Sequence, residues 1–258
     1  MARAMARISD AAAGHEALDM GKLLHILSMA MVCRAVFGST FNMDGRCQQL
    51  QDLVRSTGAL VAGYSALDFF PSLLSKAGFV RRFVCGKGAK LRSAWDGVLD
   101  EIIAEHEQDG FIDSLRSAQR KYGLSKEHVR AILIDTFFGA TDSTATLMEC
   151  VLAELMANPR AMYTLQAELR RSVPNGGSSH GDGGILTQDD LTGKPYFKAV
   201  IKECFRLHPP APLLGTHLSM DRVWLLDGYQ IPAAMPVMVN AWAIRRDPGV
   251  WSEDAHTY

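Results

Sequence analysis

The most informative segment of this chain is Lys202-Glu203-Cys204-Phe205-Arg206-Leu207-His208-Pro209-Pro210, which ends an apolar segment beginning at Tyr196. Within it Glu203 and Arg206 stand three positions apart, so they share one face of a helix that would otherwise be core. Two interpretations of this spacing are open. The charges form either a solvated surface pair or an inward ion pair, in which an arginine fork holds the carboxylate and reaches further acceptors.

A second informative segment lies upstream and reads Asp135-Thr136-Phe137-Phe138-Gly139-Ala140-Thr141-Asp142-Ser143-Thr144-Ala145-Thr146. Apolar residues recur at steps of three or four over about 125–155, which predicts one long helix with Ser125 as its N-cap. Glycine and hydroxyl residues loosen or bend a helix, so we expect a bulge or kink near Ala140. The acid beside a small-residue gap indicates either a groove where a flat ligand approaches and protons are relayed, or a close helix crossing.

Together these segments resemble the cytochrome P450 monooxygenases. The stretch Gly139-Ala140-Thr141-Asp142-Ser143-Thr144 is similar to the family's distal oxygen-binding motif, and Glu203-Cys204-Phe205-Arg206 to its Glu-x-x-Arg motif. Two later stretches, Asp227-Gly228-Tyr229-Gln230-Ile231-Pro232 and Asn240-Ala241-Trp242-Ala243-Ile244-Arg245-Arg246-Asp247-Pro248, resemble the plant microsomal (A-type) branch. The ordered set covers residues 125–258, and shorter phrases carry a weaker likeness before it.

The resemblance implies a mainly α fold with a small β-sheet near the C-terminus, that is, an incomplete cytochrome P450 fold in a single domain over residues 1–258. The expected parts are helices of the substrate-channel side, a long central helix, further helices with a flexible loop at 174–185, and the small sheet leading towards the haem-thiolate loop. Their boundaries are 1–124, 125–157, 158–208 and 209–258.

Local patterns predict the individual elements. Helices are expected over 18–36, 47–61 and 82–107. The apolar corner at 64–74 is either core packing of a helix-loop-helix corner or the region that in the family often touches the membrane surface. Asn158-Pro159 predicts a helix break with Asn as the cap. Asp227-Gly228 predicts a β-hairpin, and residues 236–240 a third short strand.

The family holds haem iron through a cysteine thiolate in a Phe-x-x-Gly-x-Arg-x-Cys loop. None of the five cysteines has these surroundings, namely Cys33, Cys47, Cys85, Cys150 and Cys204. We therefore expect an internal fragment that lacks the haem-ligating cysteine, has no other metal ligand, and is inactive alone. Smaller departures are Ala140 for the usual glycine, Ser143 for the usual threonine, and His217 where the family commonly has an arginine for a haem propionate.

For the parent protein the resemblance implies a haem-thiolate monooxygenase that inserts oxygen from O2 into an apolar small molecule, with electrons from NADPH through NADPH-cytochrome P450 reductase. Water organisation and proton delivery would fall to Asp142 and Ser143. The haem contacts would be Gly139, Ala140 and His217. The structural pair, which ties its helix to the segment after Trp242, would be Glu203 and Arg206. The substrate pocket would be lined by Phe137, Phe138, Ala211, Pro212, Leu213 and Leu214.

The resemblance places the parent at the cytosolic face of the endoplasmic reticulum membrane, in plant secondary metabolism. A net charge of −1 gives no basic field for nucleic acid, and five cysteines without a Cys-x-x-Cys pair indicate a reducing compartment. No run of eighteen apolar residues appears, so we expect no transmembrane anchor in this chain. Two alternatives remain, a haem-free helical interaction protein derived from a P450 and an unrelated all-α scaffold.

Overall fold

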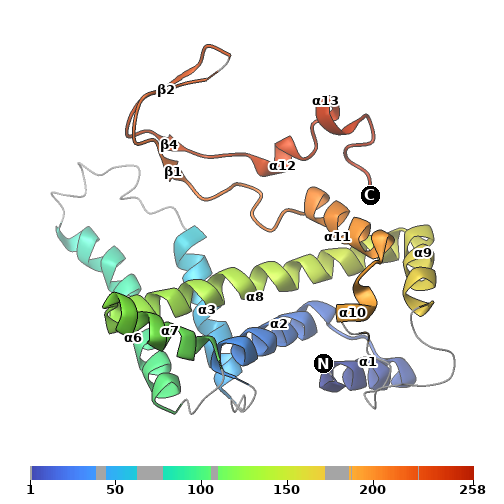
Figure 1. Cartoon of the computed structure of the whole chain (residues 1–258), viewed down its shortest axis with the longest axis horizontal. Helices are drawn as coiled ribbons and strands as arrows, with labels where there is room; N and C mark the ends of the chain where they lie inside the picture. The colour runs from blue at the N-terminus through green and yellow to red at the C-terminus, as the bar shows by residue number, and fades with distance from the viewer. Residues whose placement is uncertain are drawn as a thin grey trace. The chain divides into compact units, whose positions relative to one another are not determined.

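The computed structural model describes residues 2–38, 45–62, 78–105, 110–171, 186, 188–225 and 227–258. The chain divides into two compact units, Met1–Ala145 and Thr146–Tyr258, each of which is described by itself. Figure 1 shows helices along most of the chain and short strands only towards its C-terminal end. The fold class expected from the sequence is therefore confirmed.

The regular elements of unit 1 are all helices among its described residues. Its elements are α1 (Ala2–Gly14), α2 (Met20–Phe37), α3 (Arg46–Ala62), α6 (Gly78–Glu105), α7 (Phe111–Tyr122) and the first part of α8 (Lys126–Ala157). The backbone N–H of His128 donates to Ser125 Oγ at 3.3 Å, which confirms Ser125 as the cap of α8. The predicted helices over 18–36, 47–61 and 82–107 correspond to α2, α3 and α6, with ends that differ by a few residues.

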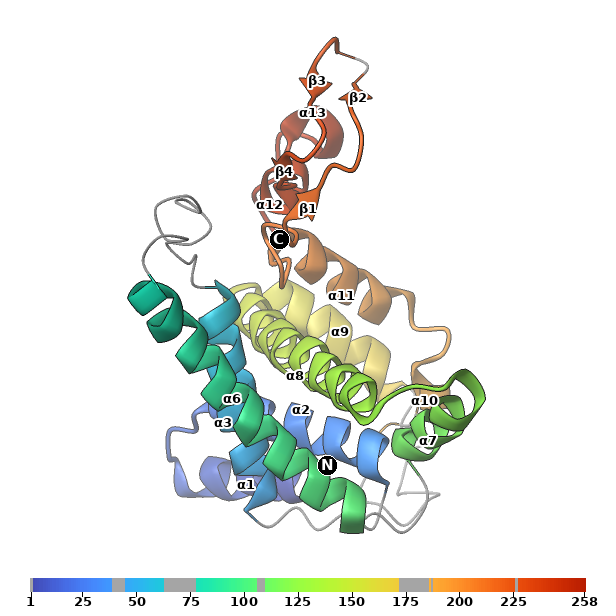
Figure 2. The same ribbon diagram turned by 90° about the vertical axis from the view of Figure 1, so that its left-hand side faces the viewer.

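The core of unit 1 forms where α6 packs across α3, which in turn packs on α2 (Figure 2). The rings of Phe37 and Phe137 stack with centroids 5.4 Å apart, and Trp95 lies 6.3 Å from Phe137. The indole N–H of Trp95 donates to Thr57 Oγ1 at 2.9 Å, so its polar atom is satisfied inside the core. A Cβ at Gly110 would lie 2.5 Å from the carbonyl oxygen of Val36, which explains why the N-cap residue before α7 is a glycine.

By length and composition alone, α2 could cross a membrane, with a mean hydropathy of 1.4 over its 18 residues. The sequence-based exclusion of such a segment was too strict. Lys22 and Arg34 interrupt the apolar run of α2, but the mean hydropathy of the helix stays high in spite of these two charges. In the structure α2 contributes seven buried residues to unit 1, among them Met29 and Phe37. It is packed as a core helix.

The long helix α8 is α-helical over its whole length, Lys126–Ala157. The expected bulge or kink near Ala140 is therefore wrong. The expected side-chain bonds are nevertheless present, because Thr141 Oγ1 donates to the carbonyl of Phe137 at 2.7 Å and Ser143 Oγ to that of Gly139 at 2.6 Å. These bonds coexist with the regular helix.

Unit 2 begins with the last turns of α8 and carries short helices and strands. Its helices are α9 (Pro159–Arg170), α10 (Gln188–Leu191), α11 (Pro195–Leu207), α12 (Ala241–Ile244) and α13 (Pro248–Trp251). A small core contains Leu155, Leu165 and Val200. The carboxylate of Glu168 on α9 accepts the backbone N–H groups of Tyr196 and Phe197 at 3.1 and 2.8 Å, and so fixes the start of α11.

The strands form two antiparallel pairs. The predicted hairpin is present as β2 (Val223–Trp224) and β3 (Gln230–Ile231), with Gly228 at a φ of 79° in the turn. The third predicted strand is β4 (Pro236–Val237), but it pairs with β1 (His217–Leu218). The single expected sheet is thus two separate two-stranded sheets.

Two sequence expectations fall on residues that the structure does not describe. They are the apolar corner at 64–74 and the loop at 174–185, and both lie outside the described residues. The break at Asn158-Pro159 is described and confirmed, because Pro159 begins α9. The Asn158 side chain does not cap α9, however, since its Nδ2 donates to the carbonyl of Glu154 at 3.0 Å.

Candidate functional site

The carboxylate of Asp142 on α8 is the most unusual polar group of unit 1. Its Oδ1 atom is buried and has no hydrogen-bond partner among the described residues, although the side chain as a whole is 41% exposed. A buried carboxylate oxygen without a protein donor is costly to leave unpaired, so it is suited to accept a hydrogen bond from water or a ligand. Asp142 therefore has one buried oxygen that can accept a hydrogen bond, whereas the side chain as a whole remains accessible to solvent.

His25 on α2 lies opposite that oxygen, with its Nε2 atom 3.9 Å from Asp142 Oδ1. The other ring nitrogen, Nδ1, is 2.8 Å from the carbonyl oxygen of Gly21, which can only accept, so Nδ1 carries a proton. In a neutral ring Nε2 then presents a lone pair to Asp142. A proton on one of the two groups, or a bridging water, is needed to join them.

His25 was not among the residues singled out from the sequence. A lone histidine in an apolar helix gives no signal of a partner more than a hundred positions away. Only the packing of α2 on α8 reveals it, where Ser28 Oγ donates to the carbonyl of Thr141 at 2.8 Å. That bond is buried and fixes the register between His25 and Asp142.

Gly139 and Ser143 share a face of α8 because they are four positions apart. A Cβ at Gly139 would meet no atom within 4 Å, so the backbone is open to an approaching group there. The Ser143 hydroxyl donates to the Gly139 carbonyl, which leaves its lone pairs free to accept. Ala140 lies between them and is half-buried. This part of α8 combines an accessible backbone with a hydroxyl and a carboxylate.

The two phenylalanines expected to line the substrate pocket have different environments. Phe137 is completely buried and stacked on Phe37, so it is a core residue of unit 1 in this structure. Phe138 is 36% exposed and is the accessible ring of the two. The remaining expected pocket residues belong to unit 2, where all four are exposed, namely Ala211, Pro212, Leu213 and Leu214.

The Glu203–Arg206 pair lies in unit 2, with the Arg206 side chain buried and the Glu203 side chain partly exposed. The Arg206 side chain is only 7% exposed, and its Nε and Nη2 donate to the two carboxylate oxygens of Glu203 at 2.9 and 2.6 Å. Burial and pairing of this kind exclude the solvated surface pair. The bond to Glu203 raises the pKa of Arg206 above its ordinary value, so the guanidinium stays charged.

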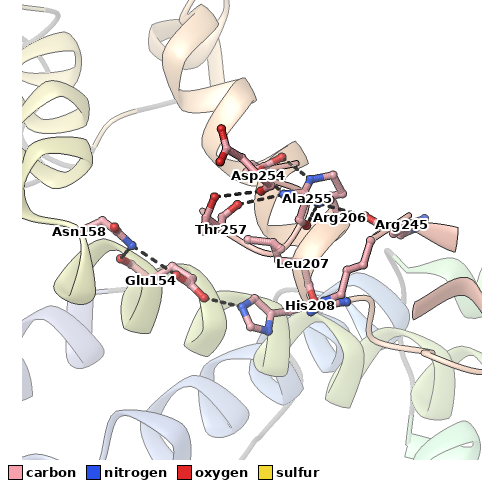
Figure 3. A network of polar contacts seen from close by, with 11 residues as sticks. Glu154, Asn158, Arg206, Leu207, His208, Arg245, Asp254, Ala255 and Thr257 are labelled. Atoms are coloured by element: carbon pink, nitrogen blue, oxygen red, sulfur yellow. Dashed lines mark hydrogen bonds and ion pairs between the residues drawn. The ribbon is translucent and has the colours of Figure 1, made fainter. Parts of the chain in front are cut away.

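Arg206 also holds the C-terminal segment through three main-chain carbonyls (Figure 3). It donates to Arg245 O at 3.0 Å, Ala255 O at 2.6 Å and Thr257 O at 3.0 Å. Its guanidinium lies 5.3 Å from the centre of the Trp251 ring. The expected link from this helix to the segment after Trp242 is thus present.

Arg246 lies beside this network. Its guanidinium stacks over Trp242 at 4.4 Å, and Nη2 donates to the carbonyl oxygen of Leu207. Burial, together with the positive charge of Arg206, lowers the pKa of Arg246 from its ordinary value. His208, at the end of α11, is joined to Glu154 of α8 by a contact of 2.6 Å between Nε2 and Oε1 (Figure 3).

His217, expected at a haem propionate, is exposed in β1 and pairs across the sheet with Val237. It belongs to unit 2 with the Glu203–Arg206 pair, whereas Asp142, Ser143, Gly139 and Phe138 belong to unit 1. The structure therefore brings the sequence-predicted residues together in two groups. The first lies on the middle of α8, and the second is spread over α11, the segment that follows it and β1.

A family model described as cytochrome P450 matches residues 1–258. The chain belongs to the cytochrome P450 family. It is 39% identical to the maize indole-2-monooxygenase, with 97% of this chain and 47% of that protein covered. It is 36% identical to the maize 3-hydroxyindolin-2-one monooxygenase, with 96% and 47% covered. This P450 chain thus spans about half the length of the curated relatives it matches.

A solved structure agrees on the fold. A zebrafish cytochrome P450 structure with progesterone superposes with a TM-score of 0.74, covering 95% of this chain and 55% of that chain, at 21% sequence identity. At this identity the likeness concerns the fold alone. It agrees with the mainly helical architecture of the two units.

Membership of the P450 family implies haem as the cofactor. The middle of α8 fits one face of a flat macrocycle, because the backbone at Gly139 is open and Asp142 Oδ1 lacks a donor. This open stretch of α8 is the place where the described residues could accommodate one face of a haem. In unit 2, burial raises the pKa of the Cys204 thiol to about 12 and that of the Cys150 thiol above its usual range.

Proposed function

We propose that the full-length protein is a haem-thiolate monooxygenase that hydroxylates a small apolar molecule with O2. NADPH-cytochrome P450 reductase supplies the electrons in this proposal. The observation that carries it is the buried, donor-free Oδ1 of Asp142 beside the open backbone at Gly139. A haem, when bound, supplies the activation of oxygen. The chain's own residues supply protons and exclude water around it.

Asp142 and Ser143 are the proposed catalytic residues. Asp142 can take a proton from solvent through its accessible side and hold it at the buried Oδ1. Ser143 donates to the Gly139 carbonyl, and this bond orients its lone pairs to accept a hydrogen bond from water. A carboxylate and a hydroxyl one residue apart are suited to positioned proton transfer. Gly139 and Ala140 would let the cofactor approach the backbone.

His25 is the proposed positioning residue for Asp142. Its ring is held by the Gly21 carbonyl, and its Nε2 faces Oδ1 at 3.9 Å. A water between them, or a proton on Nε2, would fix the rotamer of Asp142. His25 touches neither substrate nor cofactor in this proposal, so its role is to hold Asp142 in the orientation that relays protons.

We infer the substrate class from the names of two relatives. Two maize proteins of 39% and 36% identity are named for indole and 3-hydroxyindolin-2-one, which are small, flat and largely apolar. We propose a bicyclic heteroaromatic substrate of this kind. The exposed ring of Phe138 and the exposed side chains of Leu213 and Leu214 would supply apolar contacts. Ala211 and Pro212 would complete the wall, and His217 would approach a haem propionate.

The remaining features belong to the same proposal. The two units would form parts of one P450 domain. Glu203 and Arg206 would have a structural role in it, because they tie α11 to the C-terminal segment. The parent would sit at the cytosolic face of the endoplasmic reticulum membrane. The 258-residue chain alone would have no monooxygenase activity, because the raised pKa values of the buried Cys204 and the partly buried Cys150 would make both poor thiolate ligands.

The test uses the full-length protein with its reductase, NADPH and indole. Hydroxylated product that forms much more slowly in Asp142→Asn, but at the parent rate in the exposed-site control Asp227→Asn, would support the proposal. A full-length protein that binds no haem in a pyridine haemochrome assay would refute it and favour a haem-free interaction protein. For the chain alone, a thiolate-type band after reduction under carbon monoxide would contradict its proposed inactivity.

A further inference from the structure

Two cysteines of unit 1 lie next to each other, although they are far from the α8 motif in sequence. Cys33 stands in the last turns of α2, and Cys47 is the second residue of α3. Their Sγ atoms are 3.7 Å apart, with the Cys47 thiol donating to Cys33 when both are neutral. Packing of α2 on α3 holds the two sulfurs in this position.

The environments of the two thiols differ in the way that a reactive pair requires. Cys33 has no exposed surface and belongs to the core, whereas Cys47 is partly exposed. Cys47 also lies in the first turn of α3, where backbone N–H groups lack helical partners and favour an anion. Solvent can therefore reach Cys47 but not Cys33.

The pKa values of the two thiols shift in opposite directions, and the lowered one belongs to the more exposed cysteine. The hydrogen bond from Cys33 lowers the pKa of Cys47 from its usual value, although partial burial opposes this effect. The same bond, together with burial, raises the pKa of Cys33. These directions favour ionisation of Cys47 over Cys33, which can then donate a hydrogen bond to the Cys47 sulfur. A thiolate that is accessible to solvent is the usual target of peroxide.

We propose that Cys47 is an oxidation site for peroxide and that Cys33 resolves it by forming a disulfide between α2 and α3. The Cys47 thiolate attacks one oxygen of hydrogen peroxide, an S–O bond forms, the O–O bond breaks, and the departing hydroxide takes a proton to become water. Cys33 then loses its proton and attacks Cys47 Sγ, and the sulfenic oxygen leaves as a second water. Two thiols are oxidised by two electrons, which reduce one peroxide.

Disulfide formation requires only a small movement of the two sulfur atoms. The sulfurs must approach from 3.7 Å to about 2.0 Å, which a change in the Cys47 side chain at the edge of the core can provide. Cys204 of unit 2 differs from Cys47. Its Sγ donates to the carbonyl oxygen of Leu147 at 4.0 Å, and its pKa is raised to about 12. Cys150 has a raised pKa as well. Neither should compete for peroxide.

The test treats the reduced chain with hydrogen peroxide at neutral pH, blocks free thiols with N-ethylmaleimide, and digests it with trypsin. Cys33 and Cys47 fall on separate peptides, residues 23–34 and 47–55. We expect these two peptides to be joined, with a loss of two hydrogens in mass that dithiothreitol reverses. The Cys150→Ser variant should give the same joined peptides, which makes it the matched control.

Two variants separate the steps. In Cys33→Ala the sulfenic acid on Cys47 should persist and be trapped by dimedone, and in Cys47→Ser the buried Cys33 should stay a thiol. Because Cys33→Ala removes a core side chain, its helicity is first compared with that of the parent chain by circular dichroism. If it fails to fold, the parent chain and Cys47→Ser still decide the result.

Several outcomes would overturn the proposal. Cys47 should be alkylated about tenfold faster than Cys150, since thiolate fraction sets the rate, and equal rates would exclude an activated thiol. Over-oxidation of Cys47 to a sulfinic acid in the parent chain, with no joined peptides, would show that Cys33 does not resolve it. A disulfide to the peptide of Cys85, Cys150 or Cys204 would assign the oxidation elsewhere.

Discussion

Arg206 holds Glu203 through two hydrogen bonds, of 2.9 and 2.6 Å, from one turn further along α11. The same guanidinium donates to three carbonyls of residues 245–257, so all five of its N–H donors are used. A lysine has a compact charge and could not satisfy this planar arrangement. The pair therefore fixes the chain after α12 by geometry as well as by charge.

The first prediction follows from the full use of the five N–H donors of Arg206. Arg206→Ala leaves three carbonyls and a carboxylate without their donor, and should lower the free energy of unfolding by about 3 kcal/mol. Arg206→Lys should recover only part of this. Urea unfolding, with hydrogen exchange of the α11 amides as a local probe, measures the effect. Lys202→Ala, at an exposed position of the same helix, is the matched control and should change little.

The second prediction separates two neighbouring rings of α8. Phe137→Ala removes a fully buried ring from the stack with Phe37 and Trp95, and should cost about 3 to 5 kcal/mol. Phe138→Ala removes a ring that is 36% exposed and should cost much less. Both are measured by urea unfolding of the chain. Similar losses for the two variants would mean that Phe138 is also a core residue.

The sequence predicted the long helices well because their signals are local. The apolar stripe and the Ser125 cap define α8, and the Asp227-Gly228 turn defines the β2–β3 hairpin. The expected kink in α8 was wrong because side-chain bonds from Thr141 and Ser143 were taken to compete with the helix. In the structure they add to it.

Contacts between distant segments could not be predicted in the same way. The pairing of β4 with β1, rather than with the hairpin, depends on where the chain turns back after Ile231. The approach of His25 to Asp142 depends on how α2 packs against α8. The burial of Phe137 follows from three helices that meet around it, whereas the inward direction of Arg206 was one of two open interpretations until its acceptors were known.

The third prediction concerns proton delivery in the full-length protein with its reductase. Asp142→Asn keeps the size of the side chain but cannot ionise, so the rate of product formation should fall on the order of 100-fold while haem content is unchanged. His25→Gln should lower kcat by a smaller factor and leave KM unaltered, because it acts through Asp142. An unchanged kcat for His25→Gln would remove it as a positioning residue.

The fourth prediction concerns the hydroxyl of Ser143. Ser143→Ala removes the group that donates to the Gly139 carbonyl and accepts from water. In the full-length protein this variant should consume NADPH at a similar rate but yield less product, with the remaining electrons recovered as peroxide. Ser143→Thr restores the hydroxyl and serves as the control. Equal product yields per NADPH for the parent protein and Ser143→Ala would exclude Ser143 from the site.

The last prediction is a pH dependence that comes from Tyr258. Burial raises the pKa of its phenol to about 12, and its hydroxyl has no hydrogen-bond partner among the described residues. In the unfolded chain the phenol ionises near pH 10. Between these two values the folded state binds the proton more tightly, so the free energy of unfolding falls as the pH rises from about 10 to 12, and below pH 10 the contribution is complete.

Tyr258→Phe removes both the titration and an unsatisfied buried hydroxyl. It should therefore leave stability at pH 7 equal or higher and flatten the alkaline loss. Urea unfolding between pH 7 and 11 tests this, with Tyr229→Phe, at an exposed position of the hairpin, as the control. A Tyr258→Phe variant with the same alkaline loss as the parent chain would show that this phenol ionises freely in the folded unit.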